Sequence, residues 1–272
     1  MYTLGINAVF HDSAACIMKD GLLLAAAEDE RFTQIKHGKR PIPFSTYELP
    51  FHAINYCLEV AGINLKDVDH IAYSFDPNLL VPQDKRASAE ATIPFFPGPN
   101  KQEPKANAWD SLFLSSILNA PAQLVDGSPH HLEKRFRDCK DGNWQWHYVE
   151  HHLSHAASAY LPAPYEEAAV LTIDGRGEVA TTTYNIGSKQ QLSRIAQVNM
   201  PHSLGLLYER LTTYLGFLHS SDEYKVMSLA SYGKPEFVKD FREMINIGEK
   251  GQYTISGERL EERFGPARKR DA

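Results

Sequence analysis

The sequence predicts an α/β fold built from a repeated unit. Three short apolar or β-branched segments lead into a helical segment over residues 3–62, and the same order recurs over residues 168–216. Repetition of strand, strand, strand, helix indicates a duplicated unit. Apolar residues make up 43% of the chain and charged residues 23%, which is ordinary for a globular protein able to bury a sizeable core.

In the first unit, a short apolar run, a polar turn and two further runs predict a three-stranded meander. Asp20 and Gly21 form the expected hairpin tip between its second and third strands. A helix should begin near Phe51 and end at Gly62, a favoured helix-ending residue. The segment 31–43 holds two prolines and is expected to be a loop. The strands expected in this unit are residues 3–10, 14–19, 22–28, 70–75 and 145–150.

Between these strands, residues 77–108 are rich in Pro, Lys and Asn and are expected to be a loop, and residues 110–120 a helix. The second unit repeats the meander and ends in a helix over 203–216, capped by Ser203. Its expected strands are residues 168–174, 178–186 and 192–200. Tyr208 and Tyr214 are expected in the core, no closing strands are expected before Ala272, and the charged tail should fray.

Composition and charge exclude several classes of protein. A formal net charge of -6 argues against a nucleic-acid-binding surface, which needs clustered Lys and Arg. The three cysteines, Cys16, Cys57 and Cys139, are too few and too far apart for a disulfide framework. The first residues lack the pattern of a signal peptide, and no apolar run is long enough to span a bilayer. We therefore expect a cytoplasmic protein without a membrane partner.

Three histidines lie within five residues in the segment 148–161, YVEHHLSHAASAYL. On a helix of about 100° per residue, His151 and His155 lie about 40° apart, a spacing with which two histidines can bind one metal ion. His152 points sideways and is the weaker candidate. The side chains expected on the opposite, apolar face are Leu153, Ala156, Ala157 and Tyr160. A solvated helix face or a hydrogen-bonded structural pair explains the same spacing without a metal.

Asp174 is the candidate third ligand. It ends a predicted strand just before a glycine turn, where a carboxylate is well placed to face a cleft. Two imidazoles and a carboxylate suit Fe(II), Zn or Mn. The alternative is that Asp174 only initiates the turn, as Asp before Gly often does.

Other segments offer sites for acid–base chemistry or anion binding. His11 and Asp12 lie in the loop between the first two strands, where they could transfer protons or only form a turn. Gly175 and Gly177 bracket a turn whose N–H groups could meet a phosphate. Lys225 is a further candidate for phosphate, or an ordinary exposed lysine. A local basic cluster, which is either a phosphate site or a solvated charged run, contains Arg31, Lys36, His37, Lys39 and Arg40.

Taken together, five ordered segments resemble one family, the NodU/CmcH/TobZ O-carbamoyltransferases. The segments are GINAVFHDSAACIMKDG, EDERFTQIKHGKRPIP, EHHLSHAASAYLPAPYEEAAVLTIDGRGE, PHSLGLLYERLTTYLGF and DEYKVMSLASYGKP. They span nearly the whole chain. The resemblance implies a duplicated ribonuclease-H-like fold of the actin, sugar kinase and Hsp70 type. Residues 1–167 would be its first half and residues 168–272 the start of an incomplete second half.

The resemblance also implies a chemistry. ATP and carbamoyl phosphate would form carbamoyl-adenylate in a separate YrdC-like domain, and the carbamoyl group would then move to a small-molecule hydroxyl acceptor, such as a sugar or antibiotic. The implied metal, iron or alternatively zinc or manganese, is held by His151, His155 and Asp174. His11 and Asp12 match the loop near the carbamoyl group, and we take His11 as the candidate base. Lys39 and Arg40 match a basic segment near nucleotide or acceptor.

Two departures from the family pattern limit these expectations. Family chains are longer, so the adenylate-forming domain and part of the second half are expected to be missing, and this chain alone is not expected to complete catalysis. Ser228 and Ser231 stand where Gly and Pro are expected. The alternatives left open are a tRNA threonylcarbamoyl transferase-like enzyme and a non-catalytic nucleotide-binding module. The oligomeric state is also open, with a homodimer as one option.

Overall fold

The computed structural model describes residues 1–9, 11–38, 49–80, 114–126, 136, 143–218 and 221–264. These residues form two compact units, the first ending at His151 and the second beginning at His152. Each unit combines strands and helices, so the chain is a mixed α/β protein. The repeated sequence pattern predicts a division between residues 167 and 168.

The first unit contains a five-stranded sheet with the order β3-β2-β1-β4-β5. Its first three strands pair antiparallel, whereas β4 pairs parallel with β1 and β5 parallel with β4. The strands are β1 (Tyr2–Asn7), β2 (Ala14–Lys19), β3 (Leu22–Glu28), β4 (His70–Tyr73) and β5 (Gln145–Tyr148). The helices and 3-10 turns are α1 (Glu30–Thr33), η1 (Lys36–Gly38), α2 (Phe51–Ala61), η2 (Leu65–Asp67), η3 (Pro77–Leu79) and α4 (Ala120–Asp126).

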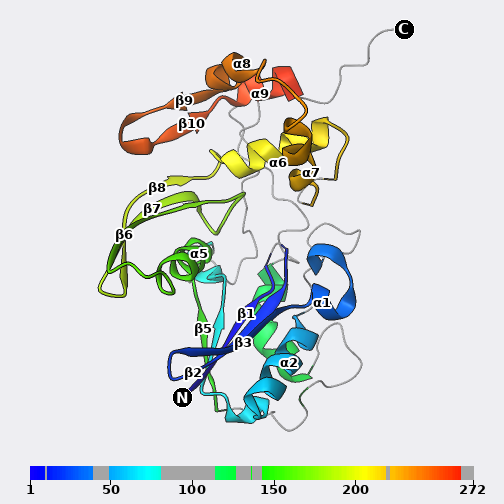
Figure 1. Cartoon of the computed structure of the whole chain (residues 1–272), viewed down its shortest axis with the longest axis vertical. Helices are drawn as coiled ribbons and strands as arrows, with labels where there is room; N and C mark the ends of the chain where they lie inside the picture. The colour runs from blue at the N-terminus through cyan, green and yellow to red at the C-terminus, as the bar shows by residue number, and fades with distance from the viewer. Residues whose placement is uncertain are drawn as a thin grey trace. The chain divides into compact units, whose positions relative to one another are not determined.

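Local sequence explains most of this unit. Asp20 and Gly21 both have positive φ, 52° and 83°, as the tight turn between two antiparallel strands requires. Helix α2 contacts β2 and β3 (Figure 1), and its buried side chains are Phe51, Ala53, Ile54, Cys57 and Leu58. It ends at Gly62 (φ 66°), whose N–H bonds back to the last turn, so the predicted helix limits are confirmed.

The basic segment differs from its prediction. Glu30–Thr33 form helix α1, and Lys36–Gly38 form the 3-10 turn η1, so the expectation of an irregular loop from residue 31 is wrong for these residues. The reason is local, because the two prolines that argue against regular structure come later, at positions 41 and 43. Lys39 and Arg40 lie outside the described residues, as do the start of the predicted helix 110–120 and most of the predicted loop 77–108.

The second unit contains a three-stranded antiparallel sheet with the order β6-β7-β8 and a two-stranded antiparallel sheet of β9 and β10. The strands are β6 (Glu167–Ile173), β7 (Ala180–Ser188), β8 (Gln191–Asn199), β9 (Ile245–Ile247) and β10 (Tyr253–Ile255). The helices and 3-10 turn are α5 (His151–Tyr160), α6 (Leu204–Tyr214), α7 (Glu223–Ala230), α8 (Val238–Met244), η6 (Glu249–Gly251) and α9 (Gly257–Phe264).

Strand β7 is buried on both faces although its sequence is mostly polar. Thr183 bonds to Thr172 of β6, and at Gly187 an added Cβ would lie 2.5 Å from the Tyr160 ring, so this face lies under helix α5. On the other face the Thr182 hydroxyl bonds to the Tyr253 hydroxyl of β10 at 2.8 Å. Because side chains alternate along a strand, threonines can satisfy both faces with hydrogen bonds.

From α6 onwards the structure differs from three predictions. A closing hairpin, β9–β10, and helix α9 follow the second meander, and a core cluster joins them to β8 and α6. Its buried members are Val198, Leu207, Tyr253, Ile255 and Leu260. The segment EERF, expected to fray, belongs to α9. Tyr208 and Tyr214, expected in the core, are exposed by 36% and 59%. Within the ranges that the structure describes, no helix has the length and apolar character needed to cross a bilayer.

Candidate functional site

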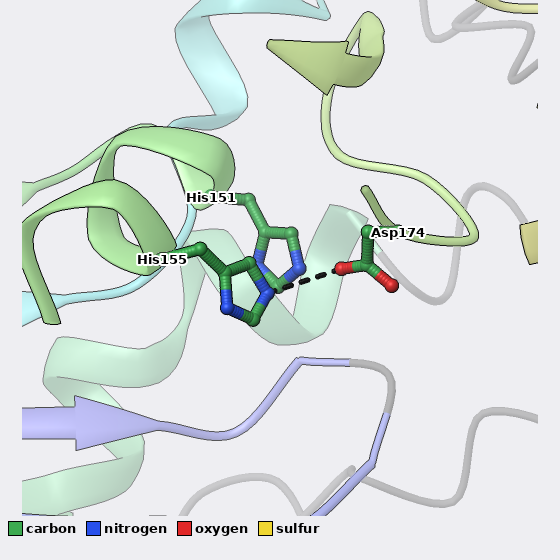
Figure 2. Close-up of side chains that lie close together, drawn as sticks. All are labelled: His151, His155 and Asp174. Atoms are coloured by element: carbon green, nitrogen blue, oxygen red, sulfur yellow. Dashed lines mark hydrogen bonds and ion pairs between the residues drawn. The ribbon is translucent and has the colours of Figure 1, made fainter. Parts of the chain in front are cut away.

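Three predicted metal ligands meet beside helix α5. His151, His155 and Asp174 each present one ligand atom, and these three atoms lie within 4.8 Å of one another. Figure 2 shows the two imidazoles on the same side of the helix with the Asp174 carboxylate opposite them. The shortest contact joins His155 Nε2 and Asp174 Oδ2 at 3.1 Å.

The histidine pair is positioned by helix geometry. His151 is the first residue of α5 and His155 follows four residues later, so their side chains lie one turn apart on one face. The compact units divide just after His151, but the helix carries both rings. The Nδ1 atom of His151 lies 3.2 Å from the Ser74 carbonyl oxygen. A carbonyl only accepts, so this contact places the His151 proton on Nδ1 and orients its Nε2 for a ligand bond.

Asp174 is held in a tightly bonded turn after β6. Its N–H donates to the Thr181 carbonyl at 3.0 Å, and its Oδ1 accepts from the Gly175 N–H at 2.6 Å. Ser203, the N-cap of α6, donates its hydroxyl to the Gly175 carbonyl at 2.6 Å. At Gly205 an added Cβ would lie 2.6 Å from the Asp174 carbonyl oxygen. The start of α6 therefore packs directly on the turn that carries the carboxylate.

The charge distribution of this cluster suits a cation. Hydrogen bonding to Asp174 raises the pKa of His155 above its ordinary value, although desolvation acts in the opposite direction. The carboxylate therefore favours positive charge beside it. Two nitrogen donors and one oxygen donor form a mixed set that fits Fe(II), Zn or Mn better than Ca or Mg, which prefer oxygen ligands.

The other face of α5 differs from its prediction. The buried side chains are those of His152, Ala156 and Tyr160, whereas Leu153, expected on the apolar face, is 38% exposed. His152 is fully buried, and its Nδ1 lies 2.6 Å from the Thr172 hydroxyl. A buried hydroxyl beneath the helix lets an imidazole replace leucine in the packed face. His152 is thus a packed core residue, on the face away from the ligand pair.

His11 and Asp12 are also in contact. His11 Nδ1 lies 2.6 Å from Asp12 Oδ2, and His37 Nδ1 lies 2.8 Å from Asp12 Oδ1. The hydrogen bond from His11, supported by that from His37, lowers the pKa of Asp12 to about 2, although burial opposes the shift. The carboxylate is therefore ionised at neutral pH and only accepts hydrogen bonds.

The predicted phosphate-binding residues have local partners. The Gly177 N–H donates to the Ala180 carbonyl at 2.8 Å, and the Gly175 N–H donates to the Asp174 carboxylate. Lys225 pairs with Asp222 at 2.8 Å on the exposed surface of α7. Lys39 and Arg40 lie outside the described residues. The phosphate contacts of all these residues stay predictions.

Sequence reasoning missed the residues that support the two clusters. Thr172, Ser203 and Gly205 position α5 or the Asp174 turn, and His37 contacts Asp12 across 25 residues of sequence. Two of these residues carried a local signal: Ser203 is predicted as a helix N-cap, and His37 precedes a glycine, where turns often form. Neither signal identifies the Asp174 turn that Ser203 supports or the carboxylate that His37 meets.

Comparison with known proteins identifies the family. Residues 2–264 match the family described as carbamoyltransferase N-terminus. The chain is 42% identical over 241 residues to protein sll1178 of Synechocystis sp., covering 87% of this chain and 35% of that protein. It is 33% identical over 258 residues to nodulation protein NolNO of Sinorhizobium fredii, covering 93% and 32%. It thus spans about a third of the length of these curated relatives.

Solved structures give a weaker match. YeaZ from Pseudomonas aeruginosa aligns with a TM-score of 0.37 and 11% identity, over 74% of this chain and 67% of that one. The sequence family is clearer, because the match extends over nearly all residues and includes every segment that resembles the O-carbamoyltransferases. The expected resemblance is therefore confirmed: this chain belongs to the carbamoyltransferase N-terminus family.

Proposed function

We propose that this chain is the carbamoyl-transferring part of an O-carbamoyltransferase. The observation that carries the proposal is the cluster of His151, His155 and Asp174 in a chain of the carbamoyltransferase N-terminus family. The donor would be carbamoyl-adenylate, made from carbamoyl phosphate and ATP. The acceptor would be a hydroxyl of a sugar, an antibiotic or another small natural product.

Within this proposal the fold is a duplicated ribonuclease-H-like fold. The first sheet supports it, because its order places three antiparallel strands beside two parallel ones. The second meander, β6-β7-β8 followed by α6, repeats the strand and helix order of β1-β2-β3 followed by α1 and α2. Formation of the adenylate is assigned to residues outside this chain, as is expected for a chain that spans about a third of its relatives.

The metal centre would support the transfer by electrostatics. A Lewis-acidic Fe(II), Zn or Mn ion held by His151, His155 and Asp174 would supply positive charge to phosphate or carbamoyl oxygens. The chain's own contribution is orientation. Ser74 meets the far side of the His151 ring, and Ser203 and Gly205 hold the turn of Asp174. Such supporting contacts commonly change metal affinity by about 10–100-fold.

The acid–base step is assigned to His11. Its Nε2 would take the proton of the acceptor hydroxyl while the hydroxyl oxygen bonds to the carbamoyl carbon. The bond between that carbon and the phosphate oxygen breaks, AMP leaves with the electron pair, and the proton passes from His11 to solvent. The products are the O-carbamoylated acceptor and AMP, so atoms and charge balance.

Metal analysis tests the centre directly. Purified wild-type chain, His151→Ala and Asp174→Ala would be loaded with Fe(II), dialysed and measured for bound metal. We expect about one ion per wild-type chain and a large loss in both variants, because each removes one of three ligands. Leu153→Ala changes an exposed residue of the same helix and should retain the metal. Equal metal content in all four proteins would reject the site.

A transfer assay tests the activity. The intact gene product would be supplied with carbamoyl phosphate, ATP and a panel of hydroxyl compounds, and carbamoylated products identified by mass. Transfer to a small molecule that is lost in His11→Ala supports the proposal. Metal binding without transfer to any acceptor would favour the non-catalytic nucleotide-binding module. Transfer to tRNA would favour the tRNA-modifying alternative, against which the net charge of -6 argues.

A further inference from the structure

The Asp12 carboxylate lies between two imidazole rings. Its Oδ2 is 2.6 Å from His11 Nδ1 and its Oδ1 is 2.8 Å from His37 Nδ1. The three side chains are exposed to different extents, His11 by 47%, Asp12 by 39% and His37 by 22%. His37 is therefore the sheltered end of the row and His11 the open end.

These contacts determine where the protons lie. An ionised carboxylate has no hydrogen to donate, so each contact requires a proton on the histidine Nδ1. In a neutral His11 the other nitrogen, Nε2, then carries the lone pair and can act as a base. The same logic applies wherever a carboxylate orients a catalytic imidazole. Because His37 bonds to one oxygen, the carboxylate cannot rotate freely while its other oxygen meets His11.

The backbone around His37 is itself held in place. The His37 N–H donates to Glu30 Oε2 at 2.8 Å, and its carbonyl accepts from the Asp12 N–H at 2.9 Å. His37 and Asp12 both have positive φ, 58° and 53°, which non-glycine residues seldom adopt. Asn7 donates to the Asp12 carbonyl at 3.0 Å from the end of β1. His37 and Asp12 are thus joined by two hydrogen bonds, one between their backbones and one between their side chains.

From this geometry we propose that His37 is a positioning residue for the transfer reaction. It fixes the Asp12 carboxylate, which in turn keeps the His11 proton on Nδ1 and leaves Nε2 to receive the acceptor proton. Glu30 supports the arrangement by holding the His37 backbone. The inference rests on the proposed function only in so far as His11 is the base; the row of contacts is a property of this unit alone.

Two substitutions at position 37 separate the imidazole from the backbone. His37→Gly keeps a residue that adopts positive φ readily but removes the donor to Asp12. His37→Asn keeps both the tolerance of positive φ and a donor to Asp12, because the amide nitrogen of asparagine lies near the place of Nδ1. Both variants therefore tolerate the positive φ of position 37, and they differ in the hydrogen bond to Asp12.

The first readout is the tautomer of His11, measured by nitrogen NMR of the histidine rings at about pH 8, where imidazoles are mostly neutral. The His11 signals are assigned from their absence in His11→Gln. In wild type the proton should lie on Nδ1. His37→Gly should shift it towards Nε2, and His37→Asn should restore the wild-type pattern. An identical His11 tautomer in wild type and both variants would overturn the proposal.

The second readout is transfer by the intact gene product. His37→Gly should lower kcat by about tenfold or more, but by less than the full 10²–10⁴-fold that a positioned general base contributes, with little change in the acceptor KM. His37→Asn should recover most of kcat. A change in KM alone, or equal kcat in both variants, would overturn the proposal. If wild type transfers no carbamoyl group, the proposed function fails, and the tautomer measurement still decides the role of His37.

Discussion

At the scale of single residues, polar side chains in this chain are held by specific neighbours. His155 meets Asp174, His152 meets the Thr172 hydroxyl, and Asp12 lies between two imidazoles. A histidine that meets a carboxylate must carry a proton on the nitrogen that faces it, and the contact so decides which nitrogen is available for a ligand or a reaction. Small changes in these neighbours should therefore change chemistry more than overall structure.

The Asp12 carboxylate should make stability depend on acid pH. Its folded pKa of about 2 lies below its ordinary 3.8, chiefly because of the hydrogen bond from His11. A depressed folded pKa contributes stability above about pH 4 that is lost as pH falls towards 2. The wild-type free energy of unfolding, from denaturant titrations over this range, should fall more steeply than that of Asp12→Asn.

The size of this effect is limited by solvent. Asp12 is more than a third exposed, so the difference above pH 4 should stay below about 1 kcal/mol. His52→Ala, which changes an exposed histidine in the first turn of α2, should show the wild-type slope. Parallel curves for wild type and Asp12→Asn would mean that the hydrogen bonds do not perturb the carboxyl.

Thr172→Val should destabilise the second unit. The hydroxyl of Thr172 meets both His152 Nδ1 and Thr183 Oγ1 in the buried layer beneath α5. Valine has the same shape but leaves these buried groups without the hydroxyl, at a cost of about 1–3 kcal/mol. Chemical denaturation measures the loss. Thr213→Val, at an exposed helix position, should change stability by less than about 0.5 kcal/mol, and equal effects of both would refute the argument.

At the scale of elements, helix α5 links a buried layer to a pair of candidate ligands, of which His151 is buried and His155 exposed. His152, Ala156 and Tyr160 pack on β6 and β7. The pair His151 and His155 lies on a different side of the helix. Asp174 completes the cluster from the turn after β6. The packing of α5 on its sheet therefore decides how far the two histidines lie from the carboxylate.

Gly205→Ala should displace the start of α6 from the Asp174 turn. The new Cβ would lie 2.5 Å from the Gly175 nitrogen, closer than real contacts allow. We expect a loss of about 1–3 kcal/mol in stability and, because Asp174 moves, about tenfold weaker metal binding. Denaturation and metal titration measure the two effects. At Gly233 the nearest atom is 3.7 Å away, so Gly233→Ala should leave both unchanged.

The sequence predicted elements that depend on local signals. The meanders, the limits of α2 and the helix with its HxxxH pair follow from apolar runs, a glycine cap and helical spacing. The burial of His152 was missed because its partner, Thr172, is twenty residues away. Strands β9 and β10 were missed because three residues are too few to show alternation.

The candidate sites follow the same rule. His151, His155 and Asp174 could be grouped because two share a helix and the third ends a strand. The contact of His37 with Asp12 joins two loops, each with positive φ, and no sequence pattern predicts which loops meet. Lys39 and Arg40 are predicted to lie near the nucleotide or acceptor, and this stays a prediction because both lie outside the described residues.

At the scale of the whole molecule, the chain is two compact α/β units, each with its own sheet. The net charge of -6 and a cluster of two imidazoles and a carboxylate argue against recognition of a polyanion.

Metal binding should stabilise the chain as a whole. An ion that binds only the folded state adds about 2.7 kcal/mol at a hundredfold excess over its Kd. Thermal unfolding with Fe(II) or Zn, compared with chelator, should show a higher Tm for wild type. Asp174→Ala should show no shift, and an equal shift in wild type and variant would indicate binding elsewhere.

The positive φ of His37 has a consequence for how this protein can vary over generations. A residue there must tolerate a left-handed backbone and also offer a nitrogen donor close to its Cβ, which leaves histidine and asparagine as the suitable choices. Their codons differ in the first base alone. A single-base substitution therefore exchanges the two tolerated residues at position 37, and most other single-base changes there should be selected against.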